Sequence, residues 1–189
     1  MEEVAKKRKA FVVVGPESSG TRFVTKLFIR VGLVEPLNNI ECSNSDFLKE
    51  VISRSRGKDS IVCRRSFPHG RRKDMWDICL SDIRDTLIVY GFDPRFIITI
   101  REQYALAGSK LYRKHCSIPD RPYESIRKEY VFILRQLTED INFYLLSTSL
   151  LMVSPNRVLR SLSKWVGFDL NTPKNTSFIV DADRKRFKS

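Results

Sequence analysis

The sequence contains no long apolar run, and its few cysteines and histidines are scattered. No stretch reaches the roughly 18 apolar residues that a membrane-spanning helix needs. The apolar run near the N-terminus has only about five residues before Gly15-Pro16, which is too short for the core of a signal peptide. The 4 cysteines form no C-x-x-C pair, and the 2 histidines do not complete a zinc spacing. We therefore expect a cytoplasmic protein without a metal site or a disulfide framework.

The composition is that of a folded chain. The 189 residues are 42% hydrophobic and 11% aromatic, which argues against disorder. The length suits one domain, and we expect it to span residues 1–189, with residues 1–9 as a flexible basic N-terminus.

Positive charge is concentrated in one segment. The chain has 34 Lys and Arg residues against 22 Asp and Glu, a formal net charge of +12. The segment from Arg54 to Lys73 holds eight basic residues and one acid, Asp59. Such a field attracts a polyanion: nucleic acid, an acidic membrane face or a multiply phosphorylated nucleotide. A basic surface that only keeps the protein soluble is the alternative.

Short β-branched runs alternate with helical periodicity along the chain. Strands are predicted at 10–14, 60–63, 95–101 and 149–153, and helices at 21–31, 75–87, 103–115, 123–144 and 155–166. Asp93-Pro94 is predicted to be a turn, and the residues from Asn171 on form a polar tail. This order predicts a three-layer α/β/α fold with a central, mainly parallel sheet, similar to the P-loop nucleotide-binding folds.

A small polar loop follows the first predicted strand. Its sequence runs from Gly15 to Arg22 with the spacing G-x-x-x-x-G-T. Backbone N–H groups at a helix N-terminus bind anions, and Thr21 adds a hydroxyl. The spacing matches a P-loop, but Thr21 stands where the Lys of a nucleotide-hydrolysing P-loop would be. The absence of that Lys argues against a complete ATP- or GTP-hydrolysing site.

A second element consists of Arg101 at the end of the third predicted strand and Ser109 eight residues later. Together with Ser19-Gly20-Thr21-Arg22, this pair resembles the sulfotransferase family. In that family such a loop binds the 5′-phosphosulfate of 3′-phosphoadenosine 5′-phosphosulfate (PAPS), and an Arg and a Ser with this spacing bind its 3′-phosphate. Three less specific segments also resemble the family: 63–70, 153–168 and the basic residues 184–187.

The resemblance implies a PAPS-dependent sulfotransferase that uses no metal. The 5′ side of the nucleotide would be held by Ser18, Ser19, Gly20, Thr21 and Arg22. The 3′-phosphate would be held by Arg101 and Ser109, with Arg184 and Lys185 of the basic C-terminal segment nearby. The family loop usually carries Lys or Arg at the position of Ser18. Arg22, Arg64 and Arg65 could supply that charge instead, the last two also contacting substrate.

Two residues are candidates for the base that takes the acceptor's proton. His69 lies in the basic segment, where neighbouring arginines disfavour its protonated form. Glu17 lies in the anion-binding loop and would have to face the acceptor. His115, the other histidine, is better explained as a helix C-terminal cap.

The acceptor would be a hydroxyl or amine of a saccharide, a small molecule or a protein Tyr. Two other functions stay open. One is a kinase-like phosphotransferase that uses ATP and Mg²⁺, and the other is a non-catalytic nucleic-acid-binding protein that uses the Arg54–Lys73 segment.

Overall fold

A parallel four-stranded sheet forms the centre of the protein. The structure is a computed structural model, and it describes residues 8–34, 53–55, 59–66, 79–112 and 121–186. The strands of the sheet are β1 (Arg8–Gly15), β2 (Ser60–Ser66), β3 (Phe92–Ile100) and β4 (Phe143–Ser147). They lie in the order β2-β1-β3-β4, and each neighbouring pair is parallel. The predicted parallel sheet is confirmed.

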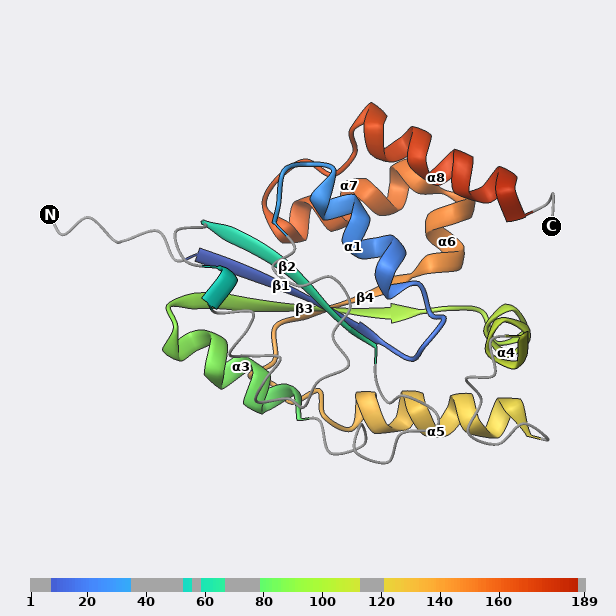
Figure 1. The fold of residues 1–189 in the computed structure, drawn as a ribbon, viewed down its shortest axis with the longest axis horizontal. Coiled ribbons are helices and arrows are strands. Elements are labelled where there is room, and N and C mark those ends of the chain that lie inside the picture. The colour runs from blue at the N-terminus through green and yellow to red at the C-terminus, as the bar shows by residue number, and fades with distance from the viewer. Residues whose placement is uncertain (1–7, 35–52, 56–58, 67–78, 113–120, 187–189) are drawn as a thin grey trace, which may run out of the picture.

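Helices cover both faces of the sheet (Figure 1). One face is covered by α1 (Thr21–Ile29), α6 (Thr148–Val153), α7 (Pro155–Val166) and α8 (Pro173–Arg186). The other face is covered by α3 (Leu80–Val89) and α5 (Pro122–Leu134), and α4 (Gln103–Tyr112) lies beyond the end of β3. The three-layer α/β/α architecture is therefore as predicted.

The first strand is buried on both faces, which is why its sequence is a continuous apolar run. Phe11 and Val13 pack in the cluster between the sheet and α1, α7 and α8. Val12 and Val14 pack in the cluster on the opposite face, toward α3 and α5. Because alternate side chains of a strand point to opposite faces, a β-branched run at this position supplies both cores.

The predicted turn at Asp93-Pro94 is wrong, because both residues belong to β3. A central strand tolerates proline only where its missing N–H has no acceptor to meet. The N–H of Phe96, two residues later, donates to the Asn142 carbonyl on the β4 side at 2.8 Å. Residue 94 faces the same side, and β4 begins opposite Phe96. Proline at position 94 therefore leaves no hydrogen bond of the sheet unmade.

The fourth strand and the helix before it also differ from the prediction. The strand is β4 at 143–147, not 149–153, and α5 ends at Leu134 rather than continuing to Tyr144. The predicted strand 149–153 lies in α6, because the Ser147 hydroxyl caps this helix by accepting from the Leu150 N–H at 3.1 Å. In an uncharged apolar segment of this kind, the hydrophobic periodicity does not distinguish a strand from a buried helix.

Both ends of the described chain are more regular than expected. β1 begins at Arg8, so the last two residues of the expected flexible segment 1–9 belong to the sheet, and residues 1–7 lie outside the described residues. The polar tail contains α8, which is anchored by the buried Asn175 and Ile179. In the part of the chain that the structure describes, no helix is both long and apolar enough to cross a bilayer.

Candidate functional site: a nucleotide-binding loop

The loop between β1 and α1 presents free donors at a helix N-terminus. Ser18 (φ 68°) and Gly20 (φ 102°) both have left-handed backbone conformations. Gly20 is the N-cap of α1, and neither a capping side chain nor an acidic residue occupies the first turn of this helix. The first N–H groups of α1 are therefore available to an anion, as the sequence predicts.

Gly15 is required by close packing at the start of the loop. A Cβ atom at this position would lie 2.1 Å from the Thr99 Oγ1 atom and 2.6 Å from the Ser19 Oγ atom. These two hydroxyls bond to each other at 2.7 Å and are fully buried. A side chain on residue 15 would therefore separate the loop from β3.

We expect the Gly15→Ala substitution to lower the free energy of unfolding by about 1–3 kcal/mol, because the added methyl group overpacks the Thr99 contact. Gly108→Ala is the matched control, since a Cβ there meets nothing within 4 Å and alanine favours the helix by about 0.5–1 kcal/mol. Urea unfolding of both variants measures the difference. Equal stability of the two variants would contradict the packing argument.

Three strand ends hold the loop through hydroxyl groups. Thr99 near the end of β3 bonds to Ser19, as described above. Thr148, directly after β4, donates from its Oγ1 atom to the Ser19 carbonyl at 3.1 Å. Ser66, the last residue of β2, lies 2.9 Å from Thr21, hydroxyl to hydroxyl. The sequence analysis did not identify Thr99, Thr148 or Ser66, although Ser and Thr at the carboxyl ends of apolar strands were the available signal.

Arg101 lies against the loop. Its Nη1 atom donates to the Ser18 carbonyl at 2.8 Å, and its backbone N–H donates to the Tyr130 hydroxyl at 3.0 Å. Burial raises the pKa of Tyr130 to about 12, so this hydroxyl stays protonated near neutral pH. The Ser18 Oγ atom is buried and has no hydrogen-bond partner among the described residues. The structure thus brings Arg101 to the loop and adds Tyr130 as its anchor.

A buried ion pair joins the two helices beside the loop. The Lys110 Nζ atom donates to the two carboxylate oxygens of Glu129 at 2.6 and 2.5 Å, and the Ser125 hydroxyl donates to Glu129 at 3.2 Å. Burial raises the pKa of Glu129, and the Lys110 ammonium opposes this shift. The negative charge of Glu17 also raises it, so the Glu17 carboxylate lies toward α5. Ser109, one residue before Lys110, is half-buried in α4.

The remaining predicted site residues are dispersed. Arg22 is exposed on α1. Arg64 and Arg65 were expected at the start of a basic loop, but both lie in β2, where Arg65 is only 3% exposed. The longer strand explains this difference, because β2 pairs with β1 as far as Gly15. Arg184 and Lys185 belong to α8, and His69 lies outside the described residues.

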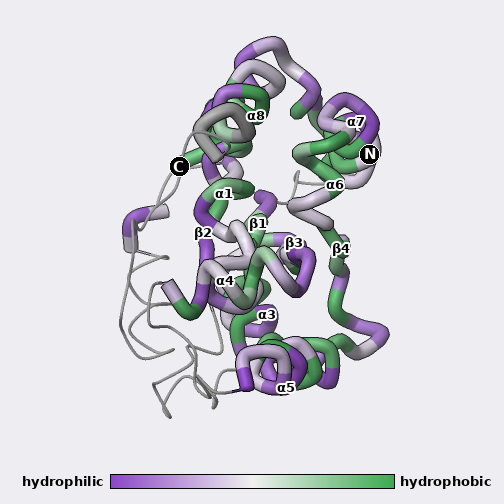
Figure 2. The backbone as a smooth tube through the Cα atoms, turned by 90° about the vertical axis from the view of Figure 1, so that its right-hand side faces the viewer, coloured by the Kyte–Doolittle hydropathy of each residue, from purple (hydrophilic) through white to green (hydrophobic). Residues whose placement is uncertain are grey.

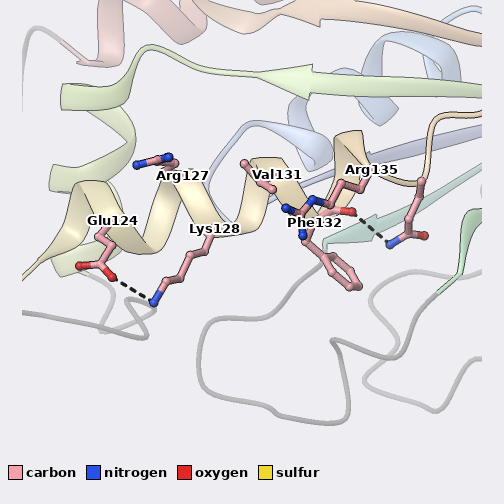
Figure 3. Close-up of a pocket in the computed structure, with 7 residues that line it drawn as sticks. Glu124, Arg127, Lys128, Val131, Phe132 and Arg135 are labelled. Carbon is pink, nitrogen blue, oxygen red and sulfur yellow. Dashed lines mark hydrogen bonds and ion pairs between the residues drawn. The ribbon is translucent and has the colours of Figure 1, made fainter.

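A cavity of about 800 Å³ lies along α5, apart from the loop (Figure 3). Its lining includes three basic side chains, Arg127, Lys128 and Arg135, and no residue of the loop. The dashed line between Glu124 and Lys128 in Figure 3 marks an ion pair of 3.0 Å. This cavity adds no group to the loop between β1 and α1.

Solved structures of two kinds share this fold. Mouse sulfotransferase SULT7A1 complexed with PAP matches 90% of this chain and 63% of its own, with a TM-score of 0.55 and 14% identity. The sulfotransferase domain of the Synechococcus PCC 7002 olefin synthase matches 89% of this chain and 77% of its own (TM-score 0.51, 15% identity). An unliganded sugar kinase from Janibacter sp. HTCC2649 matches 85% of this chain and 95% of its own (TM-score 0.51, 16% identity).

These similarities establish the P-loop-like α/β fold, which sulfotransferases and kinases share. No protein-family model matches the chain, and no curated protein sequence matches it significantly. The function therefore has to be argued from the chemistry of the loop and of the residues around it.

Proposed function

We propose that this protein is a PAPS-dependent sulfotransferase. The observation that carries the proposal is the contact between Arg101 and the loop, since the guanidinium at the end of β3 bonds to the Ser18 carbonyl. An anion-binding loop and an Arg at the neighbouring strand end suit a nucleotide with phosphates at both its 5′ and 3′ positions. ATP carries no 3′-phosphate, so an Arg reserved for that group would have no use in a kinase.

The chemistry requires positive charge on the leaving group and a base for the acceptor. The acceptor oxygen or nitrogen forms a bond to sulfur while the bond between sulfur and the 5′-phosphate oxygen breaks. The electron pair of the broken bond stays on that phosphate oxygen, and the acceptor's proton passes to the base. The N–H groups of the first turn of α1, with Arg22, stabilise the leaving phosphate. His69 or Glu17 accepts the proton.

A kinase-like phosphotransferase is the second candidate, because the sugar kinase matches this chain over 95% of its own length. Such an enzyme needs a P-loop Lys, and it needs a carboxylate beside the P-loop hydroxyl to hold Mg²⁺. Thr21 occupies the Lys position, and the group that faces Thr21 from β2 is the Ser66 hydroxyl rather than a carboxylate. Both features favour the sulfotransferase.

Nucleotide preference tests the proposal. We expect adenosine 3′,5′-bisphosphate to bind about 10- to 150-fold more tightly than AMP, the effect of one charge-assisted contact of about 1.5–3 kcal/mol. Arg101→Ala should remove most of this preference, and Ser109→Ala a smaller part. Calorimetric titration measures both affinities, and thermal shifts with ATP and Mg²⁺, or with a short DNA duplex, test the two rival functions.

The ratio of the two affinities separates two roles of Arg101. If Arg101 only braces the loop through Ser18, its loss weakens both nucleotides equally and leaves the ratio unchanged. Arg95→Ala is the matched control, because Arg95 is a part-buried arginine of β3 whose Nη1 atom bonds to the Trp165 carbonyl, remote from the loop. Equal affinity of the intact protein for both nucleotides would overturn the sulfotransferase assignment.

A further inference from the structure

The edge of the sheet at β4 has unpaired backbone groups. β4 is the last strand of the order β2-β1-β3-β4, so among the described residues it pairs with β3 alone. Figure 2 shows it as the outermost strand, below α6. Tyr144 and Leu146 pack into the core under α7, whereas Phe143 and Leu145 are 38% and 46% exposed. This edge therefore offers both free hydrogen-bonding groups and apolar side chains.

The edge carries no charge over its whole length. Residues 141–155, from two residues before β4 to the start of α7, include no Asp, Glu, Lys or Arg, although 30% of the chain is charged. On α6, Leu150 is 50% exposed and Val153 is 80% exposed. Monomeric proteins usually protect a sheet edge with charged residues or proline, so an uncharged apolar edge indicates a partner.

Opposite charges lie at the two ends of this edge. Glu139 and Asp140 precede β4 and are exposed. Helix α7 runs antiparallel to the strands, because the Val166 carbonyl accepts from Lys9 near the amino end of β1 and Tyr144 bonds to Ser161 at 2.9 Å. The exposed Arg157, one turn before Ser161, therefore lies toward the carboxyl end of β4.

We propose that two copies of this chain form a symmetric dimer through antiparallel pairing of their β4 strands. A two-fold axis at the centre of β4 places the acidic end of one edge beside the basic end of the other. It also places Leu145 of each copy opposite Leu145 of the second copy, with Phe143 as the diagonal neighbour on the same face of the joined sheet. Two chains that each carry a net charge of +12 repel one another. The uncharged edge suits the contact between the two β4 strands, because no like charges are brought together there.

Sedimentation velocity of the full chain tests the dimer at about 10–100 µM protein. The expected result is a dimer over this concentration range. Leu145→Lys should raise the dissociation constant by about 30-fold or more, since it would bring like charges together at the centre of the interface.

Two controls carry the same substitutions at equally exposed sites away from the edge. Ile88 and Val89 on α3 are 52% and 79% exposed, against 46% for Leu145, and Ile88→Lys and Val89→Lys should leave the dimer intact. The thermal midpoint of each variant reports whether it folds. A monomeric parent chain at 100 µM would overturn the proposal, and so would a folded Leu145→Lys variant that remains dimeric. Neither outcome bears on the nucleotide, so the proposed function is tested separately.

Discussion

Replacing Lys110 with methionine is expected to lower the free energy of unfolding by about 3–5 kcal/mol, the usual cost of breaking a buried ion pair on one side. Lys110 and Glu129 are both 0% exposed, so the substitution would leave a carboxylate without its counter-charge inside the protein. The Ser125 hydroxyl would remain as its one described hydrogen-bond donor. Urea unfolding at neutral pH measures this loss.

The same helix provides a matched control. Lys128 pairs with Glu124 at 3.0 Å, but the two side chains are 56% and 40% exposed. Solvent screens such a pair, and Lys128→Met should therefore cost at most about 1 kcal/mol. The double variant Lys110→Met/Glu129→Leu should recover most of the stability lost by the single variant, because no unpaired charge remains. A Lys110→Met variant as stable as Lys128→Met would contradict the buried pair.

The pH dependence of the Lys110→Met variant has a definite sign. Burial already raises the pKa of Glu129 above the ordinary value of 4.5, and losing the Lys110 ammonium removes the largest opposing influence. The folded variant then holds the proton more tightly than its unfolded chain, so its stability is highest below pH 4.5 and falls as the pH rises through the raised pKa. The double variant, which lacks Glu129, should not show this loss.

The ion pair between Lys110 and Glu129 also connects α4, which carries Ser109, with α5, whose Tyr130 holds Arg101. Lys110 follows Ser109 on α4, and Glu129 precedes Tyr130 on α5. Tyr130 holds the backbone of Arg101, and it packs with Leu106 and Ile126 in the small cluster between these helices. A weakened pair would therefore loosen both predicted 3′-phosphate contacts. The buried ion pair thus holds α4 and α5 together beside the loop, where the apolar cluster between these helices is small.

The sequence predicts the parts of the site that depend on local pattern. A β-branched run, a small polar loop and a helical period are enough to place the loop before α1, and Arg101 follows a strand that its apolar residues define. These features involve residues that are close in the chain, so spacing alone locates them. The left-handed conformation of Gly20 (φ 102°) was not predicted.

The groups that hold the site together depend on contacts between distant residues. Thr148 reaches Ser19 over 129 positions of the chain, and Lys110 reaches Glu129 across two helices. A lysine in a helical segment is usually solvent-exposed, so no local pattern indicates that Lys110 is buried. The fourth strand was predicted at 149–153, which is α6, instead of at 143–147, and this error has a related cause. An uncharged apolar segment fits a strand and a buried helix equally well, and its contacts with distant residues decide between them.

The base remains a prediction, and the described part of the chain limits where it can lie. Ser66 ends β2 and lies 2.9 Å from Thr21, hydroxyl to hydroxyl. Position 69 follows three residues later, and three residues extend at most about 11 Å. His69 itself lies outside the described residues. Glu17, the other candidate, lies in the loop itself, where its negative charge raises the pKa of Glu129.

We therefore expect the His69→Ala substitution to lower turnover by about 10²- to 10⁴-fold while leaving the affinity for adenosine 3′,5′-bisphosphate nearly unchanged. A base acts on the acceptor's proton in the transition state, so its loss reduces the rate rather than nucleotide binding. Turnover is measured as release of adenosine 3′,5′-bisphosphate from PAPS with a panel of hydroxyl and amine acceptors. His115→Ala, which removes the other histidine, is the matched control and should retain the parent rate. If His69→Ala keeps the parent rate, His69 is not the base, and Glu17→Gln should then show the loss.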